Sequence, residues 1–162
     1  MDLTTQYPRS PWETLGGVYF LPRAIDKMRA FLAGTLGPYY SHTGLSVRTF
    51  ELFRTDASTF KEIVRTHGTD EGVLASLVAI HEPSARDVAA VNLVLSWRPD
   101  GDPKLLDFIR TYLSEHALGD RPDVVTFFDL IELEEGREVP IGGRPRLSAD
   151  GTVRQPAPPP VA

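Results

Sequence analysis

Three charged residues stand three positions apart near the N-terminus: Arg23, Asp26 and Arg29. On a helix this spacing places them on one face, where two guanidiniums can hold a carboxylate between them. Three interpretations are open: an ion cluster that fixes helix packing, a site that grips an external anion, or a solvated surface. In the second, Arg9 from the preceding loop and Lys27 join the two arginines on a phosphate or carboxylate, and Asp26 orients them.

Two further acids, Asp129 and Glu132, lie on a segment that is otherwise almost entirely apolar. A helix of this kind is buried on most sides, so its carboxylates need water or cationic partners. Thr126 and Asp129 have the spacing of a capping box, in which the Asp129 carboxylate accepts from the Thr126 backbone amide. We expect packing against the N-terminal helix to bring one of the two acids to Arg23 or Arg29.

Of the four histidines, His42 lies in a loop and is the one with freedom to act. His67, His81 and His116 fall at predicted helix ends, where an imidazole can bond to the last carbonyls. The sequence contains no HExxH or HxH spacing, no Walker loop, no GxGxxG and no GxSxG. We therefore expect no metal site and no cofactor, and no residue can be assigned a catalytic role.

Two functions remain open. The first is a binding or interaction module, whose polar face on the long N-terminal helix takes a small anion or another chain, a second copy of this chain included. The alternative is a metal-independent enzyme with Asp26, His42 and Asp129 around a cleft, because neighbouring acids raise one pKa and so suit acid–base chemistry. The first is favoured, since no nucleophile with a paired base is apparent.

The elements that must position these residues are predicted to be helices. Periodicity and capping residues indicate an all-α fold, a single compact irregular bundle of about six to seven helices. The long helix spans about residues 21–33, and its small residues Ala30, Ala33 and Gly34 predict that another segment approaches closely. Its apolar stripe comprises Leu21, Ile25, Met28, Leu32 and Leu36. Further helices are predicted at about 46–53, 56–68, 70–80, 84–97, 102–113 and 126–136, with a short helical turn from Ser10 that Gly16-Gly17 ends. Their expected starting residues include Ser46, Asp56, Thr69 or Asp70, and Ser84 with Asp87.

Composition excludes several classes of protein. The chain has 162 residues, no cysteine and a net charge of −5, and its middle part, residues 56–136, carries a net charge of −9. An acidic body repels phosphodiester backbones, which makes nucleic acid an unlikely partner. The absence of cysteine excludes disulfides and thiolate ligands and fits a reducing compartment. No apolar run is long enough to cross a bilayer and no signal peptide is apparent, so we expect a cytoplasmic protein with no membrane partner.

The C-terminal part differs in composition from the rest. We place the helical domain at residues 1–137 and a Pro-rich extension at 138–162, which has six prolines in 25 residues. The alternating stretch from Arg144 to Arg154, around Asp150-Gly151, predicts a short β-hairpin. The final residues are too poor in large apolar groups to fold, and we expect them to be disordered.

Three segments resemble a known family. The family patterns are DLT..PRSP....LGG, DK.RA..AG.LG.Y and DVTTWFDLLDLEEGR. The matching residues are Asp2-Leu3-Thr4, Pro8-Arg9-Ser10-Pro11, Leu15-Gly16-Gly17, Asp26-Lys27, Arg29-Ala30, Ala33-Gly34, Leu36-Gly37, Tyr39, Asp123 to Leu130 in most positions, and Glu134-Glu135-Gly136-Arg137. Over residues 1 to about 137 the chain thus resembles a bacterial family of small proteins classified only as a domain of unknown function. The resemblance implies an all-helical cytoplasmic protein and transfers no activity. This chain lacks the Pro-Cys that often follows the tyrosine pair in that family, so a thiol-dependent role does not apply to it.

The first prediction concerns the extension. Removing all residues after Val153 should leave the melting temperature unchanged, because this segment buries too little apolar surface to offset the entropy of ordering it. Thermal unfolding of the full-length and shortened chains measures the effect. A drop of several degrees would show instead that the segment docks.

Overall fold

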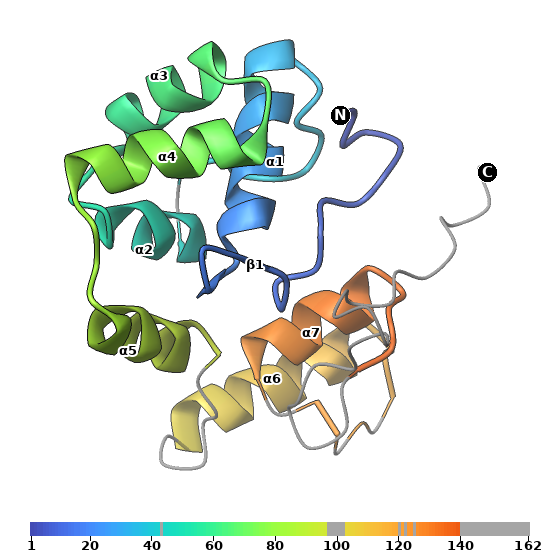
Figure 1. The fold of residues 1–162 in the computed structure, drawn as a ribbon. Coiled ribbons are helices and arrows are strands. Elements are labelled where there is room, and N and C mark those ends of the chain that lie inside the picture. The colour runs from blue at the N-terminus through green and yellow to red at the C-terminus, as the bar shows by residue number, and fades with distance from the viewer. Residues whose placement is uncertain (43, 97–102, 120, 122, 125, 140–162) are drawn as a thin grey trace. The chain divides into compact units, whose positions relative to one another are not determined.

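The computed structural model describes residues 1–42, 44–96, 103–119, 121, 123–124 and 126–139. Over these residues the chain forms seven helices and one two-stranded antiparallel hairpin, which confirms the mostly α-helical class (Figure 1). The elements are β1 (Thr14–Leu15), β2 (Val18–Tyr19), α1 (Leu21–Ala33), α2 (Leu45–Glu51), α3 (Ala57–Thr66), α4 (Asp70–Ile80), α5 (Ala85–Leu95), α6 (Pro103–Glu115) and α7 (Phe127–Glu134). The hairpin predicted at residues 144–154 lies outside the described residues.

The chain divides into two compact units, residues 1–95 and the described part of residues 96–159. The first unit contains the hairpin and helices α1 to α5, and the second contains α6 and α7. The two units are defined by contacts between residues, and this division does not test the domain boundary expected at residue 137. That boundary stays a prediction. No described helix is both long and apolar enough to pass through a bilayer.

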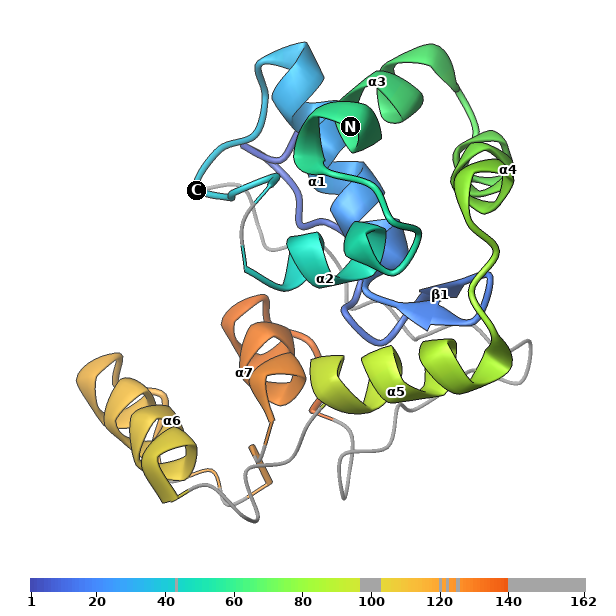
Figure 2. The ribbon, with the colours of Figure 1, turned by 90° about the vertical axis from the view of Figure 1, so that its left-hand side faces the viewer.

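Helix α1 is the central element of the first unit. It packs against α2 and α3, while α3 packs in turn against α4 (Figures 1 and 2). The predicted bounds, about 21–33, are those observed. Leu21, Ile25 and Met28 of the apolar stripe are fully buried, and Phe50 of α2 stacks on Phe60 of α3 beside them, with 4.9 Å between the ring centroids.

The polar face of α1 is buried as well, which fits the first interpretation of its charges, an ion cluster that fixes helix packing. Every residue from Leu21 to Met28 is buried, whereas Leu32 of the expected apolar stripe is partly exposed. The small residues of this face do not share one environment. Ala30 is fully buried, Ala33 is exposed, and Gly34 ends the helix in open space with a left-handed backbone. Close approach therefore holds for Ala30 alone of the three.

A single turn does form at Ser10, where the Glu13 amide donates to the Ser10 carbonyl at 3.2 Å, but the chain then continues as a hairpin and not as a helix. The Ser10 amide does donate to the Glu13 carboxylate at 3.3 Å, as a capping box requires, yet no helix follows. Gly16 and Gly17 both have positive φ, 58° and 77°, which suits the two-residue turn of a β-hairpin. The glycine pair was interpreted as a helix stop, but its left-handed backbone reverses the chain and pairs Leu15 with Val18.

Most predicted helix starts are confirmed. Asp56 accepts from the Thr59 amide, Thr69 accepts from the Gly72 amide, and Ser84 and Asp87 bond reciprocally. Ser46 was expected to cap α2, but Gly44 takes that position. Ser46 instead lies buried in the first turn of the helix.

The second unit has a small apolar core of its own. Ile109 and Leu113 of α6 pack with Leu130 of α7 and with Val124 and Val139 from the flanking chain. The capping box at the start of α7 is present: the Asp129 amide donates to Thr126 Oγ1 at 3.0 Å, and the Thr126 amide donates to Asp129 Oδ2 at 2.9 Å.

A pair of glycine substitutions tests how the N-terminal segment is fixed to the end of α1. Gly37 has a φ of 61°, and a Cβ there would lie 2.6 Å from the Leu3 carbonyl oxygen. Gly34 has a φ of 71° and nothing within 4 Å of its Cβ position. Gly34→Ala should lower the free energy of unfolding by about 1–2 kcal/mol through the left-handed backbone alone. Gly37→Ala should lower it further, because the Leu3 backbone must move away.

Urea unfolding of both variants measures this difference. The Leu3 amide donates to the Thr35 carbonyl at 2.9 Å, so any displacement of Leu3 also weakens this bond. Equal losses in the two variants would contradict the tight contact between Gly37 and Leu3.

Candidate functional site

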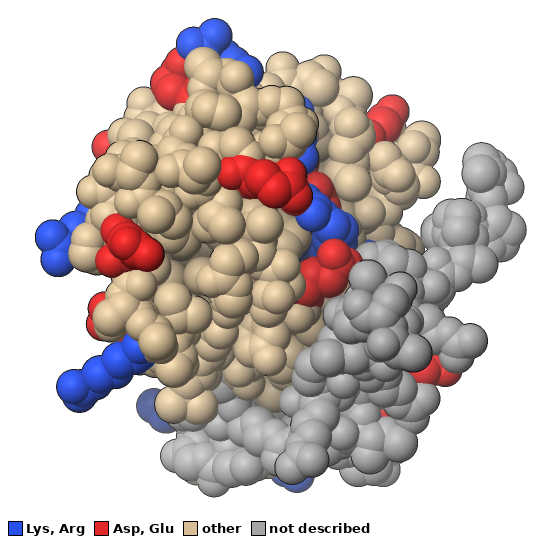
Figure 3. Space-filling view, viewed as in Figure 1, with Lys and Arg blue, Asp and Glu red and all other residues tan. Residues whose placement is uncertain are grey.

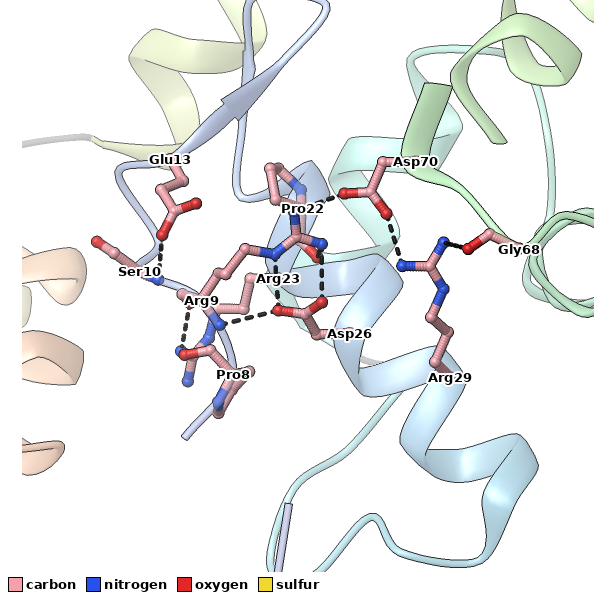
Figure 4. Close-up of polar contacts among 10 residues, drawn as sticks. All are labelled: Pro8, Arg9, Ser10, Glu13, Pro22, Arg23, Asp26, Arg29, Gly68 and Asp70. Carbon is pink, nitrogen blue, oxygen red and sulfur yellow. Dashed lines mark hydrogen bonds and ion pairs between the residues drawn. The ribbon is translucent and has the colours of Figure 1, made fainter. Parts of the chain in front are cut away.

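The candidate site is built around an ion pair between partly buried Arg9 and buried Asp26 (Figure 4). Asp26 lies on α1, and its carboxylate accepts three bonds from Arg9. The donors are Nε at 2.9 Å, Nη2 at 2.7 Å and the backbone amide at 2.9 Å. Arg9 Nη2 also donates to the Pro22 carbonyl at 3.0 Å. The planar guanidinium thus grips both carboxylate oxygens, a geometry that a lysine could not supply.

Asp70, the first residue of α4, extends this pair into a network. Its carboxylate accepts from Arg9 Nη1 at 2.5 Å and from Arg29 Nη1 at 2.6 Å. Arg29 Nη2 also donates to the Gly68 carbonyl at 3.3 Å. Burial alone would raise the pKa of Asp70, but the bonds and positive charges of Arg9 and Arg29 outweigh it and hold this pKa below its usual value.

The pKa of Arg9 is shifted in the opposite direction. Burial would lower it, but the hydrogen bonds and charges of Asp26 and Asp70 outweigh this effect and raise the pKa. Both shifts favour the charged forms of the two residues.

Arg23 and Lys27 add two cations to the same side of α1. Arg23 Nη1 donates to the Arg9 carbonyl at 2.9 Å and to the Pro8 carbonyl at 3.4 Å. Its guanidinium also lies 5.5 Å from the ring centroid of Tyr39. The Lys27 ammonium lies 4.8 Å from the ring centroid of Phe20, within the range of a cation–π interaction.

Phe20, whose ring lies against Lys27 and Arg23, has an unusual backbone conformation. It has a φ of 66°, a left-handed value that is strained for a bulky side chain, and it stands at the N-cap of α1. Its amide is fixed by the carbonyls of Pro11 and Glu13, at 3.1 and 3.2 Å. The buried ring contacts both Lys27 and Arg23.

The three-residue clamp suggested by the helical spacing is not how Asp26 is held. Among the described residues Asp26 pairs with Arg9, whereas Arg29 pairs with Asp70 on α4. Arg23 turns to the carbonyls of the N-terminal segment. The spacing placed the charges on one face, but the neighbouring segments decide their partners.

The other predicted site residues lie in separate environments. His42 is exposed, where Ser41 Oγ lies 2.9 Å from its Nδ1 and the ring of Phe31 contacts it edge to face. Asp129 belongs to the second unit, where its carboxylate caps α7 as predicted. The described contacts of Asp26 and His42 do not join the two residues.

Glu132 does have a cationic partner, as expected of an acid on a buried helix. Arg137 Nη1 lies 3.2 Å from a Glu132 carboxylate oxygen and also bonds to Glu135, and all three side chains are buried. The expected approach of Asp129 or Glu132 to Arg23 or Arg29 would join the two units and stays a prediction.

Sequence reasoning missed Asp70, Phe20 and Tyr39 as members of the network. Asp70 was recognised only as an opening residue of α4, and its pairing with Arg9 and Arg29 depends on how α3 and α4 fold back against α1. The described residues contain no group of three acids, histidines or cysteines placed to hold a metal ion. On the face in Figure 3, acidic and basic side chains are interleaved and form no broad patch of one sign.

Arg9→Ala tests the role of the ion pair. It leaves Asp26, whose side chain is 4% exposed, without its bidentate partner, and should lower the free energy of unfolding by about 3–5 kcal/mol. Arg48→Ala is the matched control, because Arg48 is 65% exposed and pairs only with exposed Glu51. Urea unfolding of both variants measures the difference, and comparable losses would show that the Arg9 pair is not a central constraint.

A family comparison places the chain among known proteins. A search of curated proteins finds no match. The model of one family matches residues 5–137, a segment that includes the whole Arg9, Asp26, Arg29 and Asp70 network. The chain therefore belongs to the family described as a domain of unknown function (DUF5069).

Proposed function

We propose that this protein is a binding module, and that the polar face of α1 recognises a small anion carrying more than one negative charge. The observation that carries this proposal is the charge of the face. Arg9, Arg23, Lys27 and Arg29 contribute four cations, and Asp26 and Asp70 contribute two carboxylates. The formal charges of these six residues alone sum to +2, in a protein whose overall charge is −5. An anion is the ligand that such a local field attracts.

The exposed fractions of the four cationic side chains indicate two different roles in binding. Arg9 and Arg29 are partly open to solvent, with side chains 28% and 27% exposed, so their guanidiniums supply direct contacts. Arg23 and Lys27 are 3% and 7% exposed and act through the field they create, which is stronger where water is excluded. Carboxylate and phosphate groups both fit the guanidinium fork.

If the anion is an acidic side chain, the same face recognises another protein chain, a second copy of this chain included. A cytoplasmic location in a bacterium belongs to the proposal as well. The enzyme alternative with Asp26, His42 and Asp129 has less support, since Arg9 grips Asp26 and Asp129 caps a helix. The binding module is therefore the better supported function.

A thermal-shift series tests the proposal. Inorganic phosphate, citrate and 3-phosphoglycerate are titrated against chloride at equal ionic strength. At least one should raise the melting temperature in a saturable way, since a ligand at 100 times its dissociation constant stabilises by about 2.7 kcal/mol. Arg29→Met should abolish the shift, because it removes a partly exposed guanidinium and keeps an apolar stem.

Two matched controls make the result specific. Arg65→Met removes an equal charge from an exposed pair with Glu62 and should leave the shift intact. Lys27→Met should weaken binding through the field, whereas Lys61→Met on α3 should not. No saturable shift with any of the three anions, or a shift that survives in Arg29→Met, would overturn the proposal.

A further inference from the structure

A serine and a histidine from neighbouring helices form a hydrogen-bonded pair away from the polar face of α1. His67 is the C-cap residue of α3, and Ser76 lies on α4. Ser76 Oγ lies 3.2 Å from His67 Nε2, and both residues are half-buried. A hydroxyl and an imidazole at this separation are a nucleophile and a possible general base.

The backbone determines which nitrogen of His67 carries the proton. Nδ1 lies 2.9 Å from the Ile63 carbonyl oxygen, which can only accept a hydrogen bond. The Thr66 hydroxyl also lies 3.0 Å from Nδ1, but its hydrogen is directed to the carbonyls of Glu62 and Ile63. We therefore assign the proton of the neutral ring to Nδ1. Nε2 is left with its lone pair toward Ser76, so the Ser76 hydroxyl donates to it. The Ile63 carbonyl thus orients the base, the role that a third group plays in nucleophilic sites.

Gly72 gives the His67 ring its place. A Cβ at Gly72 would lie 2.9 Å from His67 Cδ2, closer than side chains tolerate. Gly72 stands one turn before Ser76 on α4, so the ring lies against the same side of the helix that carries the hydroxyl. Gly72 lies within the helix, so a left-handed backbone does not explain the glycine at this position. The space that the His67 ring occupies explains it.

We propose that Ser76 is a nucleophile activated by His67, and that it accepts an acyl group from activated esters. Its hydroxyl oxygen forms a bond to the ester carbonyl carbon, and its proton passes to His67 Nε2. The bond between that carbon and the leaving oxygen breaks, and the leaving oxygen takes the proton from Nε2. The oxygen of a water molecule then forms a bond to the acyl carbon, and one proton of the water passes to Nε2. The bond between the acyl carbon and Ser76 Oγ breaks, Oγ takes the proton from Nε2, and the carboxylic acid is released. This activity uses none of the residues of the proposed anion site.

The probe for this site is p-nitrophenyl acetate. The native chain should release p-nitrophenolate and carry an acetyl group on Ser76, found by peptide mass spectrometry. Ser76→Ala should reduce release to the background from lysine acetylation. His67→Gln should slow acetylation of Ser76 by about 100-fold or more, the usual contribution of a general base. Ser58→Ala, an exposed serine at the start of α3, should leave release unchanged.

Gly72→Ala is the variant that separates this proposal from a structural role of the pair. It keeps both Ser76 and His67 and only displaces the ring, and it should slow acetylation by up to about 100-fold. Gly72→Ala also tests the proposal if the His67→Gln variant fails to fold and so shows no cooperative melting transition. Equal release from the native chain and Ser76→Ala, an acetyl group found only on lysines, or acetylation of Ser76 at the native rate in Gly72→Ala would each overturn the proposal.

Discussion

The pair of Arg9 and buried Asp26 is the interaction on which the first unit depends. A carboxylate withdrawn from water is tolerated only if its charge is matched and its oxygens are hydrogen-bonded. Arg9 meets both needs, and its backbone takes part: the amide donates to Asp26 and the carbonyl accepts from Arg23. The N-terminal segment is therefore fixed in register along α1. Through Asp70 the same guanidinium also ties α4 to this segment.

The entry into α1 carries the strain that accompanies this arrangement. Phe20 adopts a left-handed backbone at the corner between the hairpin and the helix. Two hydrogen bonds from its amide and the burial of its ring offset this unfavourable conformation. The corner places the ring beneath Lys27 and Arg23. Two cations of this face, Arg23 and Lys27, thus lie against an aromatic side chain of the core.

The connection between α3 and α4 links the two proposed sites. The Gly68 carbonyl accepts from Arg29, and Asp70 receives both Arg9 and Arg29. His67 immediately precedes this connection and bonds to Ser76 on α4. The polar face of α1 and the serine–histidine pair therefore share one structural support.

The sequence by itself determined the helices and most of their starts. The bounds of α1, the caps at Asp56, Thr69 and Ser84, and the capping box of Thr126 follow from local hydrogen bonds and side-chain periodicity, which act within a few residues. The tertiary structure alone decided the pairing of charges. Arg9 lies 17 residues from Asp26, and Arg29 lies 41 residues from Asp70, so no helical spacing could reveal these partners. It also decided that Gly16-Gly17 closes a hairpin and that the polar face of α1 is buried, because both depend on segments that only folding brings together.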